Sequence, residues 1–146
     1  MLTWLKGLFH HWPHRDITND EGDKELYLRR YYLLKLPGFA IYLHRIYRSD
    51  SDRHCHDHPW HFVTCVVAGG YIEHTLACPE GFQRCRFLPA WRPRNFAHRL
   101  TLTQTPTTTI VLRFGWKPRA WGFHTERGWI HWRNYSDWKA LEKNFQ

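Results

Sequence analysis

The fold is decided by the stretch Asp52-Arg-His-Cys-His-Asp-His-Pro-Trp-His-Phe62, which holds four histidines within eight residues. On a β-strand, residues two apart point to the same side, so a His-x-His pair directs two imidazoles toward one point. Pro59 and the apolar run after it argue against a helix. A third imidazole should come from another strand, and the best candidate ends the segment Pro93-Arg-Asn-Phe-Ala-His98. The pattern therefore predicts a metal-binding group of histidines inside a β-sheet protein.

The rest of the chain predicts a fold made almost entirely of strands. Runs rich in apolar, aromatic and β-branched residues fall at 26–36, 39–47, 60–67, 71–76, 82–87, 96–102, 107–114 and 121–124. Gly69-Gly70 and several prolines, including Pro106, lie between these runs, where turns are expected. Many short strands at about ten-residue spacing indicate an all-β sandwich or barrel. The run over residues 26–36 is also compatible with a helix, and we predict a terminal helical turn over residues 138–144.

The first part of the chain differs from the rest. We predict an N-terminal appendage and linker over residues 1–23, and a single β domain over residues 24–146. The apolar residues of the appendage have the spacing of one helical face, at Leu5, Leu8, Phe9 and Trp12. Pro13 ends this short helix, and the polar residues 16–23 are typical of a linker.

The amino-acid composition limits the classes of ligand and partner that this protein is expected to have. The chain has 146 residues, 12 His, nine Trp and a formal net charge of +8, which favours a site with aromatic walls, imidazole chemistry and an anionic ligand. No nucleic-acid motif is present, so a nucleic-acid partner is not expected. No apolar run reaches the ~18 residues of a transmembrane segment, and the first residues do not resemble a secretory signal. The four cysteines lack C-x-x-C spacing, so we expect reduced thiols in a cytoplasmic protein.

The histidine motifs resemble those of the cupin family. The first cupin motif pairs His-x-His with a Glu four or five residues on and a Gly seven residues further. With His56 and His58 as the pair, the glycine is found at Gly69-Gly70. The Glu position then falls on Phe62 or Val63, so the acidic ligand is lost.

A second register pairs His54 with His56. It supplies a chemically sensible fourth ligand in His61, but it leaves the glycine position without a glycine. The second cupin motif, Pro-x-Gly-x-x-His, matches the segment 93–98 in both registers, with Asn95 in place of its glycine. Asn tolerates a positive φ better than most residues, so this exchange is mild. We favour the first register.

The resemblance extends over about residues 27–135. It includes the segments 43–45, 56–60, 69–73, 98–100 and 121–129. Together they are similar to a group of small cupins found in bacteria and their phages. The resemblance implies a double-stranded β-helix, or jelly roll, and a homodimer formed through sheet edges.

The resemblance also implies one divalent transition metal held by His56, His58 and His98. A set of three neutral histidines suits Fe(II) and occurs in some cupin thiol dioxygenases, with Zn(II) or Ni(II) as alternatives. Glu73, on the next strand, is a candidate for the missing carboxylate or for an acceptor of an imidazole N–H. Asp57 should face away from the histidine pair and anchor the turn.

Other residues are candidates for chemistry on a bound molecule. The candidates for acid–base catalysis are His44, Tyr71 and His124, and those for substrate binding are Arg86, Arg99 and Trp121. We favour a metal-dependent cupin with oxygenase-like chemistry on a small anionic molecule. Two alternatives stay open. One is a metal-free sugar-nucleotide isomerase or epimerase with a His base and a Tyr acid, and the other is a non-catalytic cupin that binds a small ligand.

Overall fold

The computed structural model describes residues 12–18 and 25–143, which form ten strands and one helix. In chain order these are β1 (His14–Thr18), β2 (Leu26–Leu36), β3 (Phe39–Ile46), β4 (Cys55–His56), β5 (His61–Thr75), β6 (Phe82–Gln83), β7 (Ala90–Arg92), β8 (His98–Phe114), β9 (Gly122–Thr125), β10 (Gly128–His131) and α2 (Trp132–Lys143). The strands pair in the order β1-β2-β3-β8-β4-β9-β10, and β5 pairs with β6, β7 and β8. The predicted all-β architecture is confirmed.

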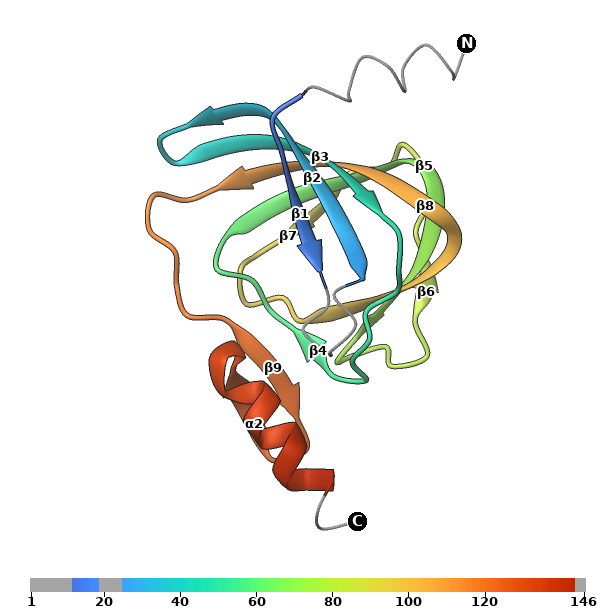
Figure 1. Cartoon of the computed structure of the whole chain (residues 1–146). Helices are drawn as coiled ribbons and strands as arrows, with labels where there is room; N and C mark the ends of the chain where they lie inside the picture. The colour runs from blue at the N-terminus through green and yellow to red at the C-terminus, as the bar shows by residue number, and fades with distance from the viewer. Residues whose placement is uncertain (1–11, 19–24, 144–146) are drawn as a thin grey trace.

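The two longest strands, β5 and β8, form the frame of the barrel. They run antiparallel from His61 opposite Phe114 to Thr75 opposite His98. The C-terminal half of β8 also pairs with β3, and its first residue pairs with β4, so β8 joins three other strands. Figure 1 shows the strands wrapped around a common interior as a jelly roll, with α2 and β9 at the end of the barrel that carries β4.

The barrel interior is filled by alternate residues of the strands, because successive side chains point to opposite faces. Its apolar part consists of Leu28, Ala40, Tyr42, Ile46, Phe62, Val66, Tyr71 and Ala90. The interior also buries His98, Glu73 and Arg92. Buried polar groups are costly unless they are hydrogen-bonded, so this polar part of the interior requires a specific network.

The two breaks predicted at Gly69-Gly70 and Pro106 are wrong. The runs on either side of Gly69-Gly70 form the single strand β5, and those on either side of Pro106 form β8. The register between β5 and β8 shifts around Gly69-Gly70. A β-bulge accommodates an extra residue without ending the strand, and it bends the strand locally.

The ends of the described chain also differ from the predictions. Residues 14–18, which overlap the predicted linker, form β1 and pair with β2. The predicted helix lies outside the described residues except for Trp12, whose indole donates a hydrogen bond to the Tyr32 carbonyl at 2.7 Å. The C-terminal helix α2 is longer than predicted, because it begins at Trp132. No helix in residues 12–18 and 25–143 has the length and apolarity that crossing a membrane requires.

Gly69 is the bulge residue least able to accept a side chain. Its φ is +76°, and a Cβ there would lie 2.6 Å from Thr107 Oγ1 and 2.7 Å from Thr107 Cα. Gly69→Ala is therefore expected to lower the free energy of unfolding by about 2 kcal/mol or more in urea denaturation. The matched control is Gly128→Ala, because Gly128 has a φ of +105° but nothing within 4 Å of a Cβ. Equal losses in the two variants would show that the contact with Thr107 is unimportant.

Candidate metal centre

Three histidines meet inside the barrel. β4 and β8 pair so that His56 lies opposite His98, and His58 follows in the loop after β4. One nitrogen of each ring lies within 4.8 Å of the other two, and the Nε2 atoms of His58 and His98 are 2.8 Å apart. Two nitrogens that bind one metal at ~2.1 Å lie roughly 3.0–3.4 Å apart, so small shifts bring these rings to a shared ion. The donor set therefore fits a divalent transition metal.

Glu73 fixes the orientation of one of these rings. Its carboxylate is fully buried and accepts a hydrogen bond from His98 Nδ1 at 2.6 Å and from Arg92 Nε at 2.9 Å. Burial opposes ionisation, but the hydrogen bonds from His98 and Arg92 outweigh it and lower the pKa of Glu73 to about 2. With its proton on Nδ1, His98 presents the lone pair of Nε2 to the histidine group. Glu73 thus takes the second of its two predicted roles, an acceptor of an imidazole N–H.

The electrostatics of the group favour metal binding. Burial lowers the pKa of His56. Burial, together with the neighbouring His98 and His56, holds the pKa of His58 well below its usual range. Both imidazoles are therefore neutral at neutral pH, and a neutral imidazole is the form that binds a metal.

The alternate ligands His54 and His61 lie elsewhere. His54 is buried under the C-terminal helix, where its ring nitrogens meet Tyr135 Oη at 2.7 Å and Glu126 Oε2 at 3.0 Å. His61 stacks on Trp91 at a centroid distance of 5.6 Å. The structure therefore brings together only the histidines of the favoured register among the described residues.

Phe62, one of the two residues on which the glutamate of the cupin motif falls, packs against the histidine group. Its ring centroid lies 4.8 Å from that of His58 and 6.1 Å from that of His98. An apolar ring against two of the three imidazoles leaves the donor set neutral, so a bound divalent ion would keep its full charge.

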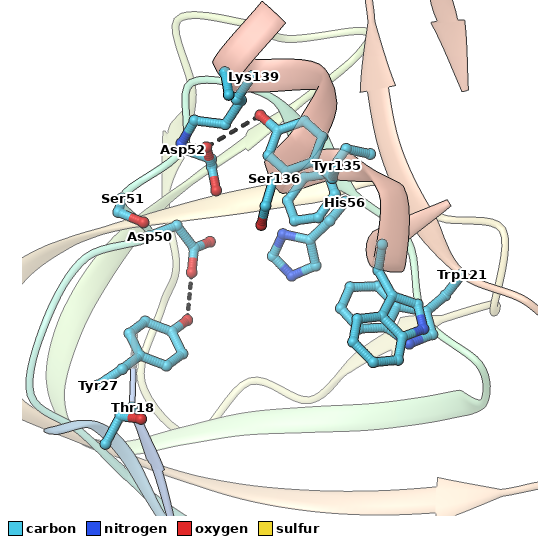
Figure 2. A pocket seen from close by; sticks show the side chains of 13 residues that line it. Thr18, Tyr27, Asp50, Ser51, Asp52, His56, Trp121, Tyr135, Ser136 and Lys139 are labelled. Carbon is cyan, nitrogen blue, oxygen red and sulfur yellow. Dashed lines mark hydrogen bonds and ion pairs between the residues drawn. The ribbon is translucent and has the colours of Figure 1, made fainter. Parts of the chain in front are cut away.

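A cavity of about 580 Å³ reaches the histidine group from outside, with His56 in its wall. Figure 2 shows this cavity, which lies between α2 on one side and the loop of Asp50 to Asp52 on the other. Aromatic rings supply much of its wall, namely Trp121, Phe123, Trp132 and Tyr135. It is large enough for a small molecule, and cavities of this size are typical of ligand sites.

The charged groups of the cavity are already paired within the chain. Asp52 accepts hydrogen bonds from Lys139 at 2.6 Å and from Tyr135 at 3.1 Å. Asp50 accepts one from the Tyr27 hydroxyl, and the same carboxylate accepts the Leu100 amide. Because Tyr135 and Lys139 belong to α2, the bonds to Asp52 also hold this helix across the end of the barrel.

The predicted catalytic residues His44 and Tyr71 occupy different surroundings. His44 faces the interior, and its Nε2 accepts a hydrogen bond from Arg30 Nε at 2.9 Å. Burial, with the charge of Arg30, holds the pKa of His44 well below its usual range. Tyr71 is only 2% exposed and does not line the cavity. Burial, with nearby Glu73, raises the pKa of Tyr71 to about 12.

The predicted substrate-binding residues are separated from one another. Trp121 lines the cavity. Arg86 is exposed and donates a hydrogen bond to the carbonyl of Gly69 at 2.7 Å, so it supports the bulge. Arg99 follows His98 in β8, and strand alternation turns it away from the interior. No arginine occurs among the described residues that line the cavity.

Three further arginines face the interior, and two of them, Arg30 and Arg113, were not among the candidate residues. Arg92 pairs with Glu73, as described above. Arg30 lies two residues from the core residue Leu28 and therefore on the same face of β2. Arg113 lies four residues from the buried Thr109 and therefore on the same face of β8. The alternation of side chains along a strand could have identified Arg30 and Arg113, since a charged residue at a core-facing position is unusual.

Asp57, between two of the histidines in sequence, anchors the segment after β8. It is 2% exposed and accepts hydrogen bonds from the Gly122 amide at 2.8 Å, from Trp129 at 3.1 Å and from Arg119. His124, a third predicted catalytic residue, lies 3.3 Å from the same carboxylate. The predicted anchoring role thus agrees with the structure, and His124 belongs to this anchor.

Asp57→Asn should loosen this segment, because the amide retains one acceptor but loses the charge. We expect the free energy of unfolding to fall by about 1–3 kcal/mol, with faster amide exchange in residues 122–131. Asp137→Asn, at an exposed position of α2, is the control. Unchanged exchange in both variants would mean that Asp57 does not hold β9 and β10 in place.

Comparisons with known proteins match at the level of structure. No family model and no curated protein matches the sequence. A crystal structure of the DMSP lyases RdDddP and RnDddQII aligns with a TM-score of 0.58 and 19% identity over 72% of this chain and 57% of that chain. Fe(II)-HppE with an alternative substrate aligns with a TM-score of 0.57 and 12% identity over 71% and 56%. KdgF from Halomonas sp. aligns with a TM-score of 0.55 and 16% identity over 75% and 89%.

The strand pairing and these neighbours define the chain as a jelly-roll protein with a histidine group in its interior. It has the cupin fold, as the histidine motifs predicted. The chain spans little more than half the length of the first two structures.

Proposed function

We propose that this chain is a metal-dependent enzyme that acts on a small anionic molecule. His56, His58 and His98 would hold one divalent transition metal. The observation that carries the proposal is the convergence of their three nitrogens within 4.8 Å, with His98 oriented by a buried carboxylate. A metal held there supplies a Lewis acid or, in the case of iron, a centre for oxygen chemistry.

The surroundings of the histidines support an anionic substrate and Fe(II). Phe62 leaves the donor set neutral, so the charge of the ion is not reduced by a protein carboxylate. A negatively charged substrate would offset that charge. Fe(II) suits three neutral histidines, and Zn(II) or Ni(II) are the alternatives. We favour oxygenase-like chemistry, and a metal-assisted lyase or isomerase step is the second reaction class.

The cavity gives a molecule its route to the centre. His56 belongs both to the histidine group and to the cavity wall. Trp121 and Trp132 stack at 5.6 Å with an interplanar angle of 11°, which makes one wall rigid. Such a wall orients a small molecule with little loss of side-chain entropy. The metal-free isomerase is less well supported, because Tyr71, the tyrosine predicted as its acid, is buried away from the cavity, although Tyr27 and Tyr135 line it.

Oxygen uptake tests the proposed reaction class. Fe(II)-loaded and Zn(II)-loaded protein would be mixed with small carboxylates, thiols and phosphate esters, and dissolved oxygen and substrate would both be followed. Oxygen uptake with the Fe(II) form alone is the expected result. Substrate loss without oxygen uptake would point to the lyase or isomerase class. Binding without turnover in either form would overturn the enzymatic proposal and favour a ligand-binding protein.

A further inference from the structure

Two arginines face the barrel interior from β2 and β8, the two strands that pair with β3. Arg113 on β8 lies opposite Ala40 on β3 and Phe62 on β5, and these partners are only 0% and 9% exposed. Arg30 on β2 lies opposite His44, which has the same strand parity on β3 as Ala40. Because cross-strand partners share a face of the sheet, both guanidinium groups belong to the interior side.

Neither guanidinium has a carboxylate partner among the described residues. Arg30 Nε donates to His44 Nε2 at 2.9 Å, and its guanidinium lies 4.9 Å from the ring centroid of Tyr42. The guanidinium of Arg113 lies 4.1 Å from the ring of Trp60, and its buried Nε makes no hydrogen bond. The contacts of both cations are therefore neutral groups, and part of their hydrogen-bonding capacity is unused.

Two other arginines, Arg92 in the interior and Arg119 in the segment between β8 and β9, are neutralised by carboxylates of the chain itself. Arg92 pairs with Glu73, and Arg119 pairs with Asp57. A cation that is partly withdrawn from water without a counter-charge is unfavourable, which is why such charges are usually paired. The contrast between the two sets of arginines points to a counter-ion that comes from outside the chain.

One of the two cations is next to a ring that contacts the candidate metal centre, because Arg113 lies opposite Phe62, whose ring centroid is 4.8 Å from that of His58. Burial lowers the pKa of Arg30, and the charge of Arg113 acts in the same direction. A divalent ion at the histidines would add further positive charge to this part of the interior, so an anion there would be favoured more strongly.

We propose that Arg30 and Arg113 bind an oxyanion group, a carboxylate or a phosphate, of the ligand that reaches the three-histidine centre. His44 positions Arg30 by accepting from Nε, which leaves the terminal amino groups of that guanidinium for the anion. Both arginines are half-buried and neither lines the cavity beside His56, so the proposed anion site adjoins the histidine group next to Phe62 and His58. The planar fork of a guanidinium matches the oxygens of either group. The proposal rests on the proposed function for the identity of the centre, but guanidinium–anion binding itself needs no metal.

Calorimetric titration of metal-free protein at low ionic strength tests the proposal. Acetate and inorganic phosphate are titrated separately, so that binding of one and not the other identifies the anion class. Arg30→Gln and Arg113→Gln are each expected to weaken the binding seen in the natural protein about tenfold, since a charge-assisted hydrogen bond is lost. Arg86→Gln and Arg99→Gln are the matched controls, and their affinities should stay within about twofold, because both lie outside the interior.

Several results would overturn the proposal. They are the absence of binding of either anion, unchanged affinity in Arg30→Gln and Arg113→Gln, and equal losses in all four variants, which would show a non-specific effect of charge. If a glutamine variant does not fold, the lysine variant at that position replaces it. Lysine keeps the charge and loses the fork, so weaker anion binding at an unchanged melting temperature supports the proposal and unchanged binding contradicts it.

The design separates this proposal from the proposed function. Anion binding is measured without metal, and metal binding is measured in the same arginine variants by titration with Co(II). Loss of anion affinity with unchanged Co(II) affinity is the expected combination. Failure of the natural protein to bind Co(II) would contradict the metal centre and leave the anion site standing.

Discussion

Glu73→Ala is expected to lower the free energy of unfolding by about 3–5 kcal/mol, because it removes the buried carboxylate that neutralises Arg92 and orients His98. The remaining guanidinium would be buried without a counter-charge, which costs more than the loss of the hydrogen bonds alone. Urea denaturation of metal-free protein, followed by tryptophan fluorescence, measures the change.

The matched control is Glu80→Ala, which removes an exposed carboxylate in the turn after β5. Its expected effect is within about 0.5 kcal/mol. Glu73→Gln separates packing from charge, since the amide keeps the volume of the side chain. It should also weaken metal binding by about 10–100-fold, because partners behind a metal-ligating histidine typically contribute that much. A loss in Glu73→Ala no larger than in Glu80→Ala would contradict the role of this network.

Removal of a ligand has the second large expected effect. His98→Ala and His56→Ala should each weaken Co(II) binding by more than about 100-fold, because the loss of a ligand exceeds the loss of an outer partner. The fold should persist, since the strands rather than a metal bury the core, and circular dichroism would verify this. Absorption of Co(II) bound to the protein reports the affinity.

His61→Ala is the matched control, because His61 is a ligand of the alternative register and lies on Trp91 instead. Its Co(II) affinity should equal that of the natural protein. Loss of Co(II) affinity in His61→Ala, together with unchanged affinity in His98→Ala, would show that the metal site had been assigned to the wrong histidines.

The strands were predictable because their apolar and aromatic periodicity is local. It was not predictable that β5 continues through Gly69-Gly70 and β8 through Pro106. A bulge is defined by the register with the partner strand, and no local sequence pattern contains that register. The start of α2 at Trp132 was also missed. Its first turn has no acidic residue, which is one of the usual sequence signals of a helix start.

The three histidines that converge in the structure are the ones named from the sequence, but the argument that named them was incomplete. The His-x-His spacing suggested two rings on one face of a strand, but β4 ends at His56, and His58 reaches the group from the following loop. Arg86 and Arg99 were proposed to bind substrate because a guanidinium suits an anion, without information on which way either side chain points. The charge of a residue does not tell whether its side chain points into or out of the barrel. The alternation of side chains along β2, by contrast, places Arg30 on the inward face.

The most direct test of the account is the metal content of protein purified without a histidine tag. The chain is loaded in turn with Fe(II), Co(II) and Zn(II), excess ion is removed, and bound metal is counted by mass spectrometry. We predict one ion per chain in the natural protein and none in the double variant His56→Ala/His98→Ala. No bound ion in the natural protein, or the same amount in the double variant, would contradict a metal centre built from these histidines.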